Sequence, residues 1–551
     1  MPKSEYLRYN VLFILILLNL QAVIGQPTKS IEPYYDIELS DAERDSLFDN
    51  LKQTLESYKS LHALRMDNSV PPSLIFDPLP QGFQLDQEQL AINWNLPKSI
   101  SLPANRNELA FFPVYKLSVL IMNKKITSAE LTNIYLDRLK KFGDTLQCVI
   151  TLMEDHALMQ AKKADEEIAK GKYRGPLHGI PYGIKDLLAV EGTRTTWGAA
   201  PYKEQTISTT ATVVKKLEEA GAVLVAKFTL GALAMGDIWY GGVTKNPWNL
   251  EQGSSGSSAG SASATAAGLV AFSIGTETWG SIVSPATRCG VTGLRPTFGR
   301  VSRHGAMALC WSMDKIGPMC RSALDCALVF DAIRGHDGYD KTVRGAAFNY
   351  DGTIDVKKLK VGYIKSQFES KYANRGNDSI ALQAIRTLGV TLTPVELPGE
   401  LPVNALTIIL SSEAGAAFDE LTRSNRDSLL TDQRRRAWPN IFRSSRFIPA
   451  VEYINANRIR TQLIEAYHER TKDFDVIIAP SFGGNQLLMT NLTGHPCLVV
   501  PNGFNEQGGP TSISFLGKLF GEAALLALGK AYQDATQWDD MAPPLFQASR
   551  K

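Results

Sequence analysis

The sequence predicts an α/β fold built on a mixed or parallel sheet. From residue 127 onward, amphipathic helical segments alternate with short apolar runs. ATVVKKLEEAGAVLVAKF, for example, joins a helical pattern, a glycine and a strand pattern. Hydrophobic residues make up 44% of the 551 residues and charged residues 21%, so a large buried core is available. No segment recurs at a fixed period, which disfavours solenoids and propellers.

The balance of charge restricts the partners of the chain. Its net charge is +2 without a long run of one sign, which argues against a nucleic-acid-binding arm or a polybasic membrane patch. We therefore expect no nucleic-acid partner. The arginine run QRRRAW (433–438) is interpreted as the solvated face of a helix.

Six cysteines are present, none of them in a Cys-x-x-Cys pair or a Cys/His cluster with zinc-like spacing, so no metal site is expected. Most are expected to be buried small hydrophobic residues, although pairs within 310–326 leave room for a disulfide. The six are Cys148, Cys289, Cys310, Cys320, Cys326 and Cys497.

The N-terminus has the pattern of a secretory signal peptide at residues 1–25. A basic segment precedes the apolar run VLFILILLNL (11–20), and small residues then lead into a polar stretch. The apolar run is shorter than the ~20 residues of a membrane-spanning helix. We therefore expect a secreted or lumenal protein; the alternative is an uncleaved membrane anchor at residues 11–24. The sequons at Asn377 and Asn491 fit a secreted glycoprotein.

Residues 26–110 are predicted to form an N-terminal accessory extension. The sequence SDAE (40–43) has the pattern of a capping box that opens a charged amphipathic helix, which should end near Met66. Prolines interrupt the segment that follows this helix. The main domain is assigned to residues 111–540 and a C-terminal tail to residues 541–551.

Within the main domain the elements follow from local pattern. TSAE (127–130) opens a helix that Gly143 should end, CVITLM is a strand, and ALMQAKKADEEIAK is a helix. LHGIPYGIKDLLAV is an apolar strand-like run that carries Lys185, and DFDVIIAP and HPCLVVP are later strands. SMDKIGPMCRSALDCALVFDAIRG predicts a loop and a capped helix, and EAALLALGKAYQDAT a closing amphipathic helix. Residues 337–440 are less regular.

The chain is organised around residues 251–293. They begin as a Gly/Ser-rich loop with Ser257, pass into an Ala-rich helical run and an apolar strand, and end in a tight turn with Ser281. A flexible linker is the ordinary interpretation of the Gly/Ser loop, but its apolar neighbours favour a folded core. GSSAG also matches G-x-S-x-G with Ser258 as nucleophile. That motif requires a preceding strand, which TKNPWNLEQ disfavours, and a histidine, for which His495 is the candidate.

Lys185 is the candidate base for a serine nucleophile that does not use histidine. Burial lowers the pKa of a lysine because an apolar setting disfavours the ammonium form, and Lys185 ends a predominantly apolar run. A surface lysine paired with Asp186 is the alternative, and periodicity leaves the choice open.

Several separated motifs resemble those of the amidase signature family. They are GIPYGIKD, SGSSAGSASA, GTETWGSIVSPATRCGVTGLRPTFGRVSRHG and SMDKIGPMCRS, and the resemblance covers roughly residues 110–540 in the family's order. It implies a central mixed sheet flanked by helices on both faces and a Ser–Ser–Lys triad. It also implies hydrolysis of a carboxamide without a metal ion or an organic cofactor.

The resemblance implies roles for individual residues. Ser281 matches the nucleophile, Ser257 the bridging serine that relays protons, and Lys185 the base. Backbone N–H groups of the turn Thr278-Trp279-Gly280-Ser281 should stabilise the oxyanion. Ser258 is grouped with these oxyanion and substrate-binding residues, where it should support its loop by hydrogen bonding.

The sequence departs from the usual family turn at three positions. Trp279 stands where relatives have a small residue, and it is expected to line or narrow the acyl pocket. Glu277 replaces the usual Asp, and Val283 replaces the Arg often found two residues after the nucleophile. Arg288 is then the candidate for any carboxylate recognition.

Three functions follow from this pattern. The first is a secreted or lumenal amidase that acts alone on a small-molecule amide. The second is the A subunit of a tRNA-dependent amidotransferase, which RPTFGRVSRHG and SMDKIGPM also fit but a secretory signal does not. The third is a secreted binding protein on an inactive amidase scaffold, against which the retention of Ser257, Ser281 and Lys185 speaks. The identity of the amide and the oligomeric state stay open.

Overall fold

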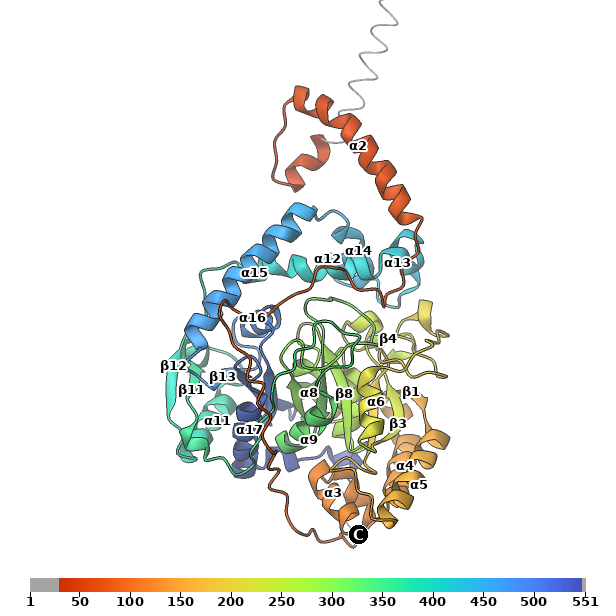
Figure 1. The fold of residues 1–551 in the computed structure, drawn as a ribbon, viewed down its shortest axis with the longest axis vertical. Coiled ribbons are helices and arrows are strands. Elements are labelled where there is room, and N and C mark those ends of the chain that lie inside the picture. Colours follow the sequence, from red (N-terminus) through yellow and green to blue (C-terminus); the bar gives the residue numbers. More distant parts are fainter. Residues whose placement is uncertain (1–28, 548–551) are drawn as a thin grey trace, which may run out of the picture. The chain divides into compact units, whose positions relative to one another are not determined.

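An eleven-stranded mixed sheet organises the larger of the two units into which the chain divides, residues 71–551 (Figure 1). Neighbouring strands β3, β2 and β8 run parallel, as do β13, β11 and β12, and the other neighbours are antiparallel. The predicted α/β fold with a mixed sheet is therefore confirmed. In order across the sheet, the strands are β1 (Val149–Leu152), β3 (Val223–Phe228), β2 (Pro181–Lys185), β8 (Phe272–Glu277), β10 (Lys315–Cys320), β9 (Thr292–Arg295), β14 (Cys497–Phe504), β15 (Pro510–Gly517), β13 (Val476–Pro480), β11 (Val361–Ile364) and β12 (Leu392–Val395).

The structure is a computed structural model that describes residues 29–547. The predicted signal peptide at residues 1–25 and the alternative anchor at 11–24 lie outside the described residues. Within the described range, no helix has the length and apolar character that crossing a membrane requires.

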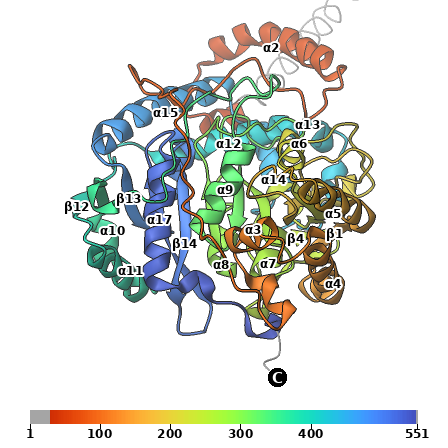
Figure 2. The ribbon, with the colours of Figure 1, turned by 60° about the horizontal axis from the view of Figure 1, so that its bottom comes forward.

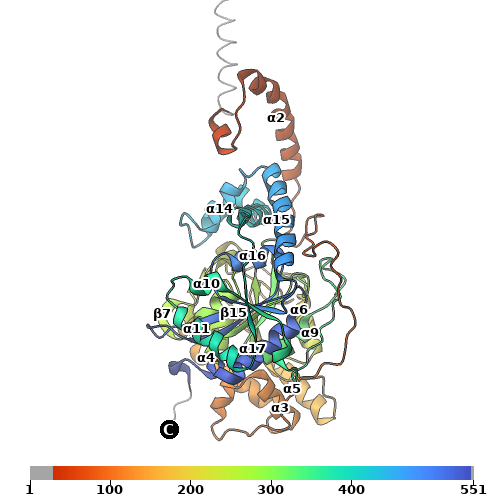
Figure 3. The same cartoon turned by 90° about the vertical axis from the view of Figure 1, so that its left-hand side faces the viewer.

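Helices cover both faces of the sheet (Figure 2). Successive residues of β14 separate the two faces: Leu498 and Val500 pack in one core with α9 and α17, whereas Cys497 and Val499 pack in another with α7 and α8. Helices α14, α15 and α16 lie over one end of the sheet (Figure 3). The helices of this unit are α3 (Val114–Met122), α4 (Ser128–Leu146), α5 (Glu154–Ala169), α6 (Thr212–Glu219), α7 (Ala259–Ala266), α8 (Val283–Cys289), α9 (Ala323–Ile333), α10 (Lys365–Glu369), α11 (Arg375–Thr387), α12 (Thr407–Ala417), α13 (Asp419–Arg423), α14 (Trp438–Ser445), α15 (Ala450–Thr471), α16 (Gln486–Thr493) and α17 (Glu522–Thr536).

The described part of the smaller unit, residues 29–70, contains helix α2 (Asp41–His62). The predicted capping box is present: the Glu43 N–H donates to Ser40 Oγ at 3.3 Å, and the Ser40 N–H donates to Glu43 Oε2 at 2.7 Å. The helix ends at His62, slightly before the predicted Met66.

The boundary between the two compact units falls after Val70, within the segment 26–110 that the sequence assigns to the accessory extension. Residues 71–110 belong to the larger unit because the irregular segment pairs with it. The Asn93 N–H donates to the carbonyl oxygen of Tyr350 at 3.1 Å, for example. The proline-rich sequence therefore lies along the main domain.

The last described residues also pack on the larger unit, contrary to the expected tail at residues 541–551. Phe546 is fully buried, and its ring meets Phe142 edge-on with 5.1 Å between centroids. Its carbonyl oxygen accepts a hydrogen bond from Arg138 Nη2 at 2.8 Å. The domain therefore continues at least to residue 547.

Helix α4 continues past Gly143, where the sequence predicts its end. Gly143 lies inside the helix, at a place where an added Cβ would come 3.1 Å from Val149 Cγ2. The left-handed residue that ends the helix is Gln147, with φ of 47°. A close approach of the following strand, and not chain termination, explains this glycine.

Several strands were outside the prediction, namely β9, β10, β11, β12 and β15. KIGPMC, predicted as a loop, is β10 in the middle of the sheet. It tolerates Pro318 because its pairing with β9 is limited to Met319 and Cys320. Gly317 allows β9 to approach closely, since an added Cβ would come 2.0 Å from the carbonyl oxygen of Leu294.

All six cysteines are buried and free. The prediction that most are buried small hydrophobic residues is confirmed. No disulfide forms between the cysteines at 310–326, which all lie in the described part of the chain.

Candidate active site

The candidate catalytic residues lie close together where the parallel strands β2 and β8 end. Lys185 is the last residue of β2, and β8 runs beside it with Ile274 paired to Ile184. Parallel strands end at the same edge of a sheet, so the turn 278–281 that follows β8 comes to the same place as Lys185. The loop before α7, which carries Ser257, completes this group.

Hydroxyl groups surround the amino group of Lys185, whose side chain is fully buried. Its Nζ donates to Ser257 Oγ at 2.7 Å, to Thr276 Oγ1 at 2.8 Å and to Ser258 Oγ at 3.2 Å. The sequence did not predict the contact with Thr276. The other two contacts join Lys185 to the Gly/Ser loop.

Burial lowers the pKa of Lys185 to about 7, against the opposing effect of the negative charges of Asp314 and Glu277. A large fraction of the amine is therefore neutral near pH 7 and able to accept a proton. The alternative partner, Asp186, forms its ion pair elsewhere: its Oδ1 lies 2.9 Å from the Nζ of Lys227, and both side chains are fully buried. Lys185 is thus not a surface lysine.

The loop of Ser257 is joined directly to the loop of Ser281. The peptide bond before Ser257 is cis. The Ser258 N–H donates to the carbonyl oxygen of Ser281 at 3.2 Å, and the hydroxyl groups of Ser255 and Ser284 lie 2.8 Å apart. These contacts hold the two serine loops against each other.

Ser281 is partly exposed, and its hydroxyl group makes no hydrogen bond within residues 29–547. The expected bond to Ser257 is therefore not formed in this structure. Hydrogen bonds between catalytic groups often tighten only when substrate binds. What the structure brings together is the pair Lys185 and Ser257, with Ser281 on the adjoining loop.

The turn from Thr278 to Ser281 offers unpaired backbone donors. Gly280 has φ of 84°, a left-handed conformation that glycine adopts without strain. In the described part of the chain, the N–H groups of Trp279, Gly280 and Ser281 donate to no acceptor. Unpaired N–H groups in a tight turn are the donors that stabilise a developing oxyanion.

Glu277 fixes the far side of this turn. Its Oε2 accepts the N–H groups of Ile282 at 2.8 Å and Val283 at 3.0 Å. Its Oε1 accepts from Arg295 Nη1 at 2.7 Å and from Asn491 Nδ2 at 2.8 Å. Burial alone would raise the pKa of Glu277, but the charge and hydrogen bond of Arg295 and the other donors lower it to about 2. The carboxylate is therefore ionised whenever the protein is folded near neutral pH.

Asp314 fixes the near side of the turn. Its Oδ1 accepts the hydroxyl proton of Thr278 at 2.6 Å. Its Oδ2 accepts the N–H groups of Leu309 and Cys310, each at 2.9 Å. The side chain of Thr278 is therefore occupied, and only its backbone is left for other partners.

The departures from the family turn have different structural outcomes. The indole of Trp279 is 45% exposed, so it is open to a ligand. Val283 is fully buried and presents no polar group. Arg288 is exposed, and its Nη1 donates to Gln252 Oε1 at 3.2 Å, so it does not take the place of an Arg beside the turn.

The alternative with Ser258 as nucleophile is not supported. Ser258 is fully buried, and its Oγ donates to the carbonyl oxygen of Thr276 at 3.0 Å and accepts the Thr276 N–H at 3.1 Å. Ser258 makes hydrogen bonds that support its loop, as expected, and it also accepts one from Lys185 Nζ; because it is fully buried, it does not bind substrate as its grouping suggested. His495 is 4% exposed, and its Nδ1 lies 2.8 Å from Thr493 Oγ1.

Both sequon asparagines use their side-chain amides inside the fold. Asn491 is fully buried and binds Glu277. Asn377 donates through Nδ2 to the carbonyl oxygen of Phe504 at 2.9 Å and to Thr511 Oγ1 at 2.8 Å. The folded protein therefore presents neither amide for a glycan.

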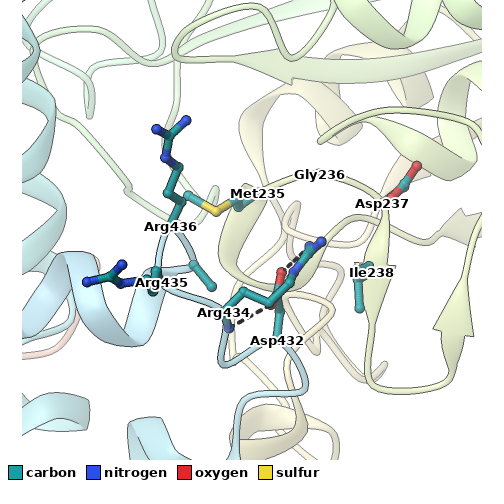
Figure 4. A pocket seen from close by; sticks show the side chains of 9 residues that line it. Met235, Gly236, Asp237, Ile238, Asp432, Arg434, Arg435 and Arg436 are labelled. Atoms are coloured by element: carbon teal, nitrogen blue, oxygen red, sulfur yellow. Dashed lines mark hydrogen bonds and ion pairs between the residues drawn. The ribbon is translucent and has the colours of Figure 1, made fainter.

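A cleft of about 440 Å³ opens beside the loop that carries Ser257 (Figure 4). Gly236 in one wall touches this loop, since a Cβ added to Gly256 would come 1.9 Å from its carbonyl oxygen. The other wall contains the arginine run, which forms an exposed loop before α14 and not the helix face that was predicted. The lining residues are Met235, Gly236, Asp237, Ile238, Asp432, Arg434, Arg435, Arg436 and Ala437.

Sequence reasoning missed four residues of the site: Thr276, Arg295, Asp314 and Asn491. The first three lie inside the motifs GTETWG, LRPTFG and SMDKIG, but a single sequence gives no sign that they contact the site. Asn491 lies 214 positions from Glu277 and has no local signal except its sequon.

Comparison with known proteins identifies similar sequences over most of the chain. The sequence profile of the Amidase family matches residues 130–490. The A subunit of glutamyl-tRNA(Gln) amidotransferase from Marinomonas sp. (strain MWYL1) is 35% identical over 477 residues, which cover 78% of this chain and 98% of that protein.

Solved structures show the same similarity. Native peptide amidase from Stenotrophomonas maltophilia has a TM-score of 0.70 at 29% identity, covering 80% of this chain and 100% of that chain. The A subunit of glutamyl-tRNA(Gln) amidotransferase from Thermotoga maritima has a TM-score of 0.66 at 25% identity, covering 81% and 98%. The family match spans the whole interval from Lys185 to Ser281.

Proposed function

The chain belongs to the Amidase family and is a hydrolase of amide C–N bonds, and from this membership we propose the roles of its residues. Ser281 is the nucleophile, Ser257 relays protons and Lys185 is the base. The observation that carries this proposal is the buried Nζ of Lys185 at 2.7 Å from Ser257 Oγ. Retention of all three groups disfavours a binding protein on an inactive scaffold.

Neutral Lys185 accepts the proton of Ser257 while Ser257 accepts the proton of Ser281. The Ser281 Oγ then attacks the amide carbonyl carbon, and a tetrahedral intermediate forms. The pKa of Lys185, lowered to about 7 by burial, supports its action as a base near neutral pH.

The intermediate's oxyanion accepts hydrogen bonds from the unpaired N–H groups of the turn 278–281. Each such donor stabilises the transition state by about 3–4 kcal/mol. Glu277 and Asp314 contribute by holding the turn from both sides, so that the donors need no rearrangement during the reaction.

Collapse of the intermediate breaks the C–N bond. Ser257 donates the proton to the leaving ammonia or amine and recovers it from Lys185. Water then attacks the ester on Ser281, with the same groups accepting its proton, and the carboxylic acid leaves. Every proton that Lys185 accepts is returned, so the cycle needs no other acid or base.

We infer that the substrate is a small-molecule amide whose acyl part carries a flat apolar group. The exposed indole of Trp279, two residues before Ser281, supports this, because aromatic faces bind such groups.

We also propose that the protein is secreted after removal of residues 1–25. The basic segment, the apolar run and the small residues before Gln26 support this. The mass of the exported protein should correspond to a chain that begins at Gln26. A full-length chain in the membrane fraction would support the anchor at 11–24 instead. Glycosylation is not part of the proposal, because a glycan on either asparagine would disturb the hydrogen bonds that its amide makes in the folded protein.

A second candidate function is that of the A-type component of an amidotransferase. The 35% identity to such a protein over 98% of its length favours it. A component of this kind would need partner chains for its full reaction. Ammonia release by the purified protein alone, from amides other than glutamine, would favour the free amidase.

Two measurements test the main proposal. The purified protein is first assayed for ammonia release on a panel of aryl, short aliphatic, long-chain and peptide C-terminal amides. It is then treated with a fluorophosphonate, and the labelled peptide is identified by mass spectrometry. Label on Ser281 that Lys185→Ala suppresses supports the triad, and label on Ser258 would contradict it.

A further inference from the structure

Thr276 has no role in the steps above, yet its side chain touches the base. Its Oγ1 lies 2.8 Å from Lys185 Nζ, almost as close as Ser257 Oγ at 2.7 Å. In the described residues, this hydroxyl makes no other hydrogen bond. Thr276 is the second-last residue of β8, where it pairs with Ile316 of β10. A β-branched side chain on a paired strand has little rotational freedom, so the hydroxyl is fixed in place.

Toward Lys185, the hydroxyl group of Ser258 can only accept a hydrogen bond, because its own proton is used elsewhere. The Ser258 hydroxyl donates its only proton to the carbonyl oxygen of Thr276 at 3.0 Å. It accepts the Thr276 N–H at 3.1 Å and a proton of Lys185 at 3.2 Å. Thr276 therefore acts on the base in three ways: its hydroxyl lies 2.8 Å from Nζ, its carbonyl oxygen is a longer acceptor at 3.5 Å, and its backbone orients Ser258.

A neutral lysine amine has two N–H donors and one lone pair. If Ser258 and Thr276 accept the two N–H groups, the remaining tetrahedral position of Nζ faces Ser257. The lone pair is then aimed at the one hydroxyl from which a proton must be taken. Without the Thr276 hydroxyl, one N–H group keeps only the more distant carbonyl oxygen of Thr276 as an acceptor at 3.5 Å, and the amine can rotate its lone pair away from Ser257.

We propose that Thr276 is a positioning residue that aims the lone pair of Lys185 at Ser257. This rests on the proposed role of Lys185 as the base. The same hydroxyl also accepts a hydrogen bond from the ammonium form of Lys185. Its removal therefore has two separable effects: the reaction slows because the amine is misoriented, and the protonated form of Lys185 is destabilised. The charged groups that face Lys185, Asp314 and Glu277, are unchanged by substitutions of Thr276.

The test is the rate at which a fluorophosphonate labels Ser281, measured from pH 5 to pH 10 on the purified protein. The Ser281 Oγ forms a bond to phosphorus, fluoride leaves, and the proton passes through Ser257 to Lys185. This readout needs no knowledge of the natural amide. The variants are Thr276→Val, which keeps the shape and removes the hydroxyl, and Thr276→Ser, which keeps the hydroxyl.

For Thr276→Val we expect the plateau rate at high pH to fall about tenfold. The midpoint of the pH profile should move to lower pH by about one unit, because the ammonium form loses an acceptor. Thr276→Ser should stay within about twofold of the parent protein, at an unchanged midpoint. A purely structural disturbance would lower the fraction of protein that is labelled, but it would not shift the midpoint of the pH profile to lower pH. If Thr276→Val does not fold, Thr276→Ala provides the same comparison.

An unchanged plateau and midpoint in a folded Thr276→Val protein would overturn the role of Thr276. A loss in Thr276→Ser as large as in Thr276→Val would also overturn it, because the hydroxyl would not be the cause. Lys185→Ala separates this failure from failure of the proposed function. If Lys185→Ala labels like the parent protein, Lys185 is not the base; if it does not label, only the role of Thr276 is at issue.

Discussion

Asn491 Nδ2 donates a hydrogen bond to Glu277 Oε1 at 2.8 Å, although the two residues are 214 positions apart. The same carboxylate holds the backbone of Ile282 and Val283, directly after Ser281. The position of the nucleophile thus depends on helix α16, which the motif around Ser281 does not include. The site is assembled by the fold as a whole and not by its two loops alone.

Amidase activity should increase as the pH is raised through about 7. The neutral amine of Lys185 is the reactive form, so activity is lost as pH falls through its pKa of about 7 and the amine becomes protonated. The measurement is kcat/KM against pH for any hydrolysed amide. An acid limb with its midpoint near 4 would instead indicate a carboxylate as the base.

Lys185→Arg should strongly reduce activity even though it keeps a long cationic side chain. A guanidinium has no accessible neutral form, so it cannot take the proton from Ser257. We expect kcat to fall by about 10²–10⁴-fold, the usual contribution of a general base. Circular dichroism checks the fold, and Lys472→Arg, at an exposed ion pair with Glu469, is the matched control. Retained activity in Lys185→Arg would show that positive charge is what the site needs.

Glu277→Gln should weaken both the fold and the reaction. Arg295 is fully buried, and removal of its partner leaves an uncompensated charge that costs about 3–5 kcal/mol of unfolding free energy. The turn also loses its ionised acceptor, so kcat should fall about 100-fold with little change in KM. Urea unfolding and steady-state kinetics measure the two effects. Glu469→Gln, at the surface, should change neither, and equal effects in both variants would contradict the role of the buried pair.

Trp279→Gly should change which acyl groups are accepted. It introduces the small residue that the resemblance to the amidase signature family implies for this position, and it removes an exposed aromatic face. Loss of an aromatic contact of about 0.5–1.5 kcal/mol should raise KM for aryl amides up to about tenfold relative to KM for short aliphatic amides. The ratio of the two KM values is the measurement. An equal loss for both amides would place the effect of Trp279 on the oxyanion turn.

The sequence was sufficient where local pattern and structure agree. Alternating helix and strand patterns located β1, β2, β3, β8, β13 and β14, and the motifs located Lys185, Ser257 and Ser281. These residues lie within or next to elements whose local sequence favours the structure that they adopt. Each motif is also one continuous stretch of the chain. The pairing of Lys185 with Ser257 followed from the family resemblance and not from periodicity.

The strands and site residues that the sequence did not predict depend on tertiary contacts. Strand β10 contains Gly317 and Pro318, which locally favour a loop, but pairing with β8 from Lys315 to Met319 overrides that preference. Thr276 is found only when β2 and β8 are placed side by side. Arg295 and Asn491 are found only when the carboxylate that they share is known to be buried.

The burial of Asn491 has a consequence for producing the protein. A eukaryotic secretory host modifies sequons while the polypeptide is still emerging and unfolded, when this asparagine is as accessible as any other. A sugar attached at that moment would prevent the amide from reaching Glu277. The carboxylate that holds the turn after Ser281 would then lack one of its hydrogen bonds. Recombinant material from such a host should therefore divide into active unmodified chains and inactive modified ones, whereas a bacterial host should give a single active form.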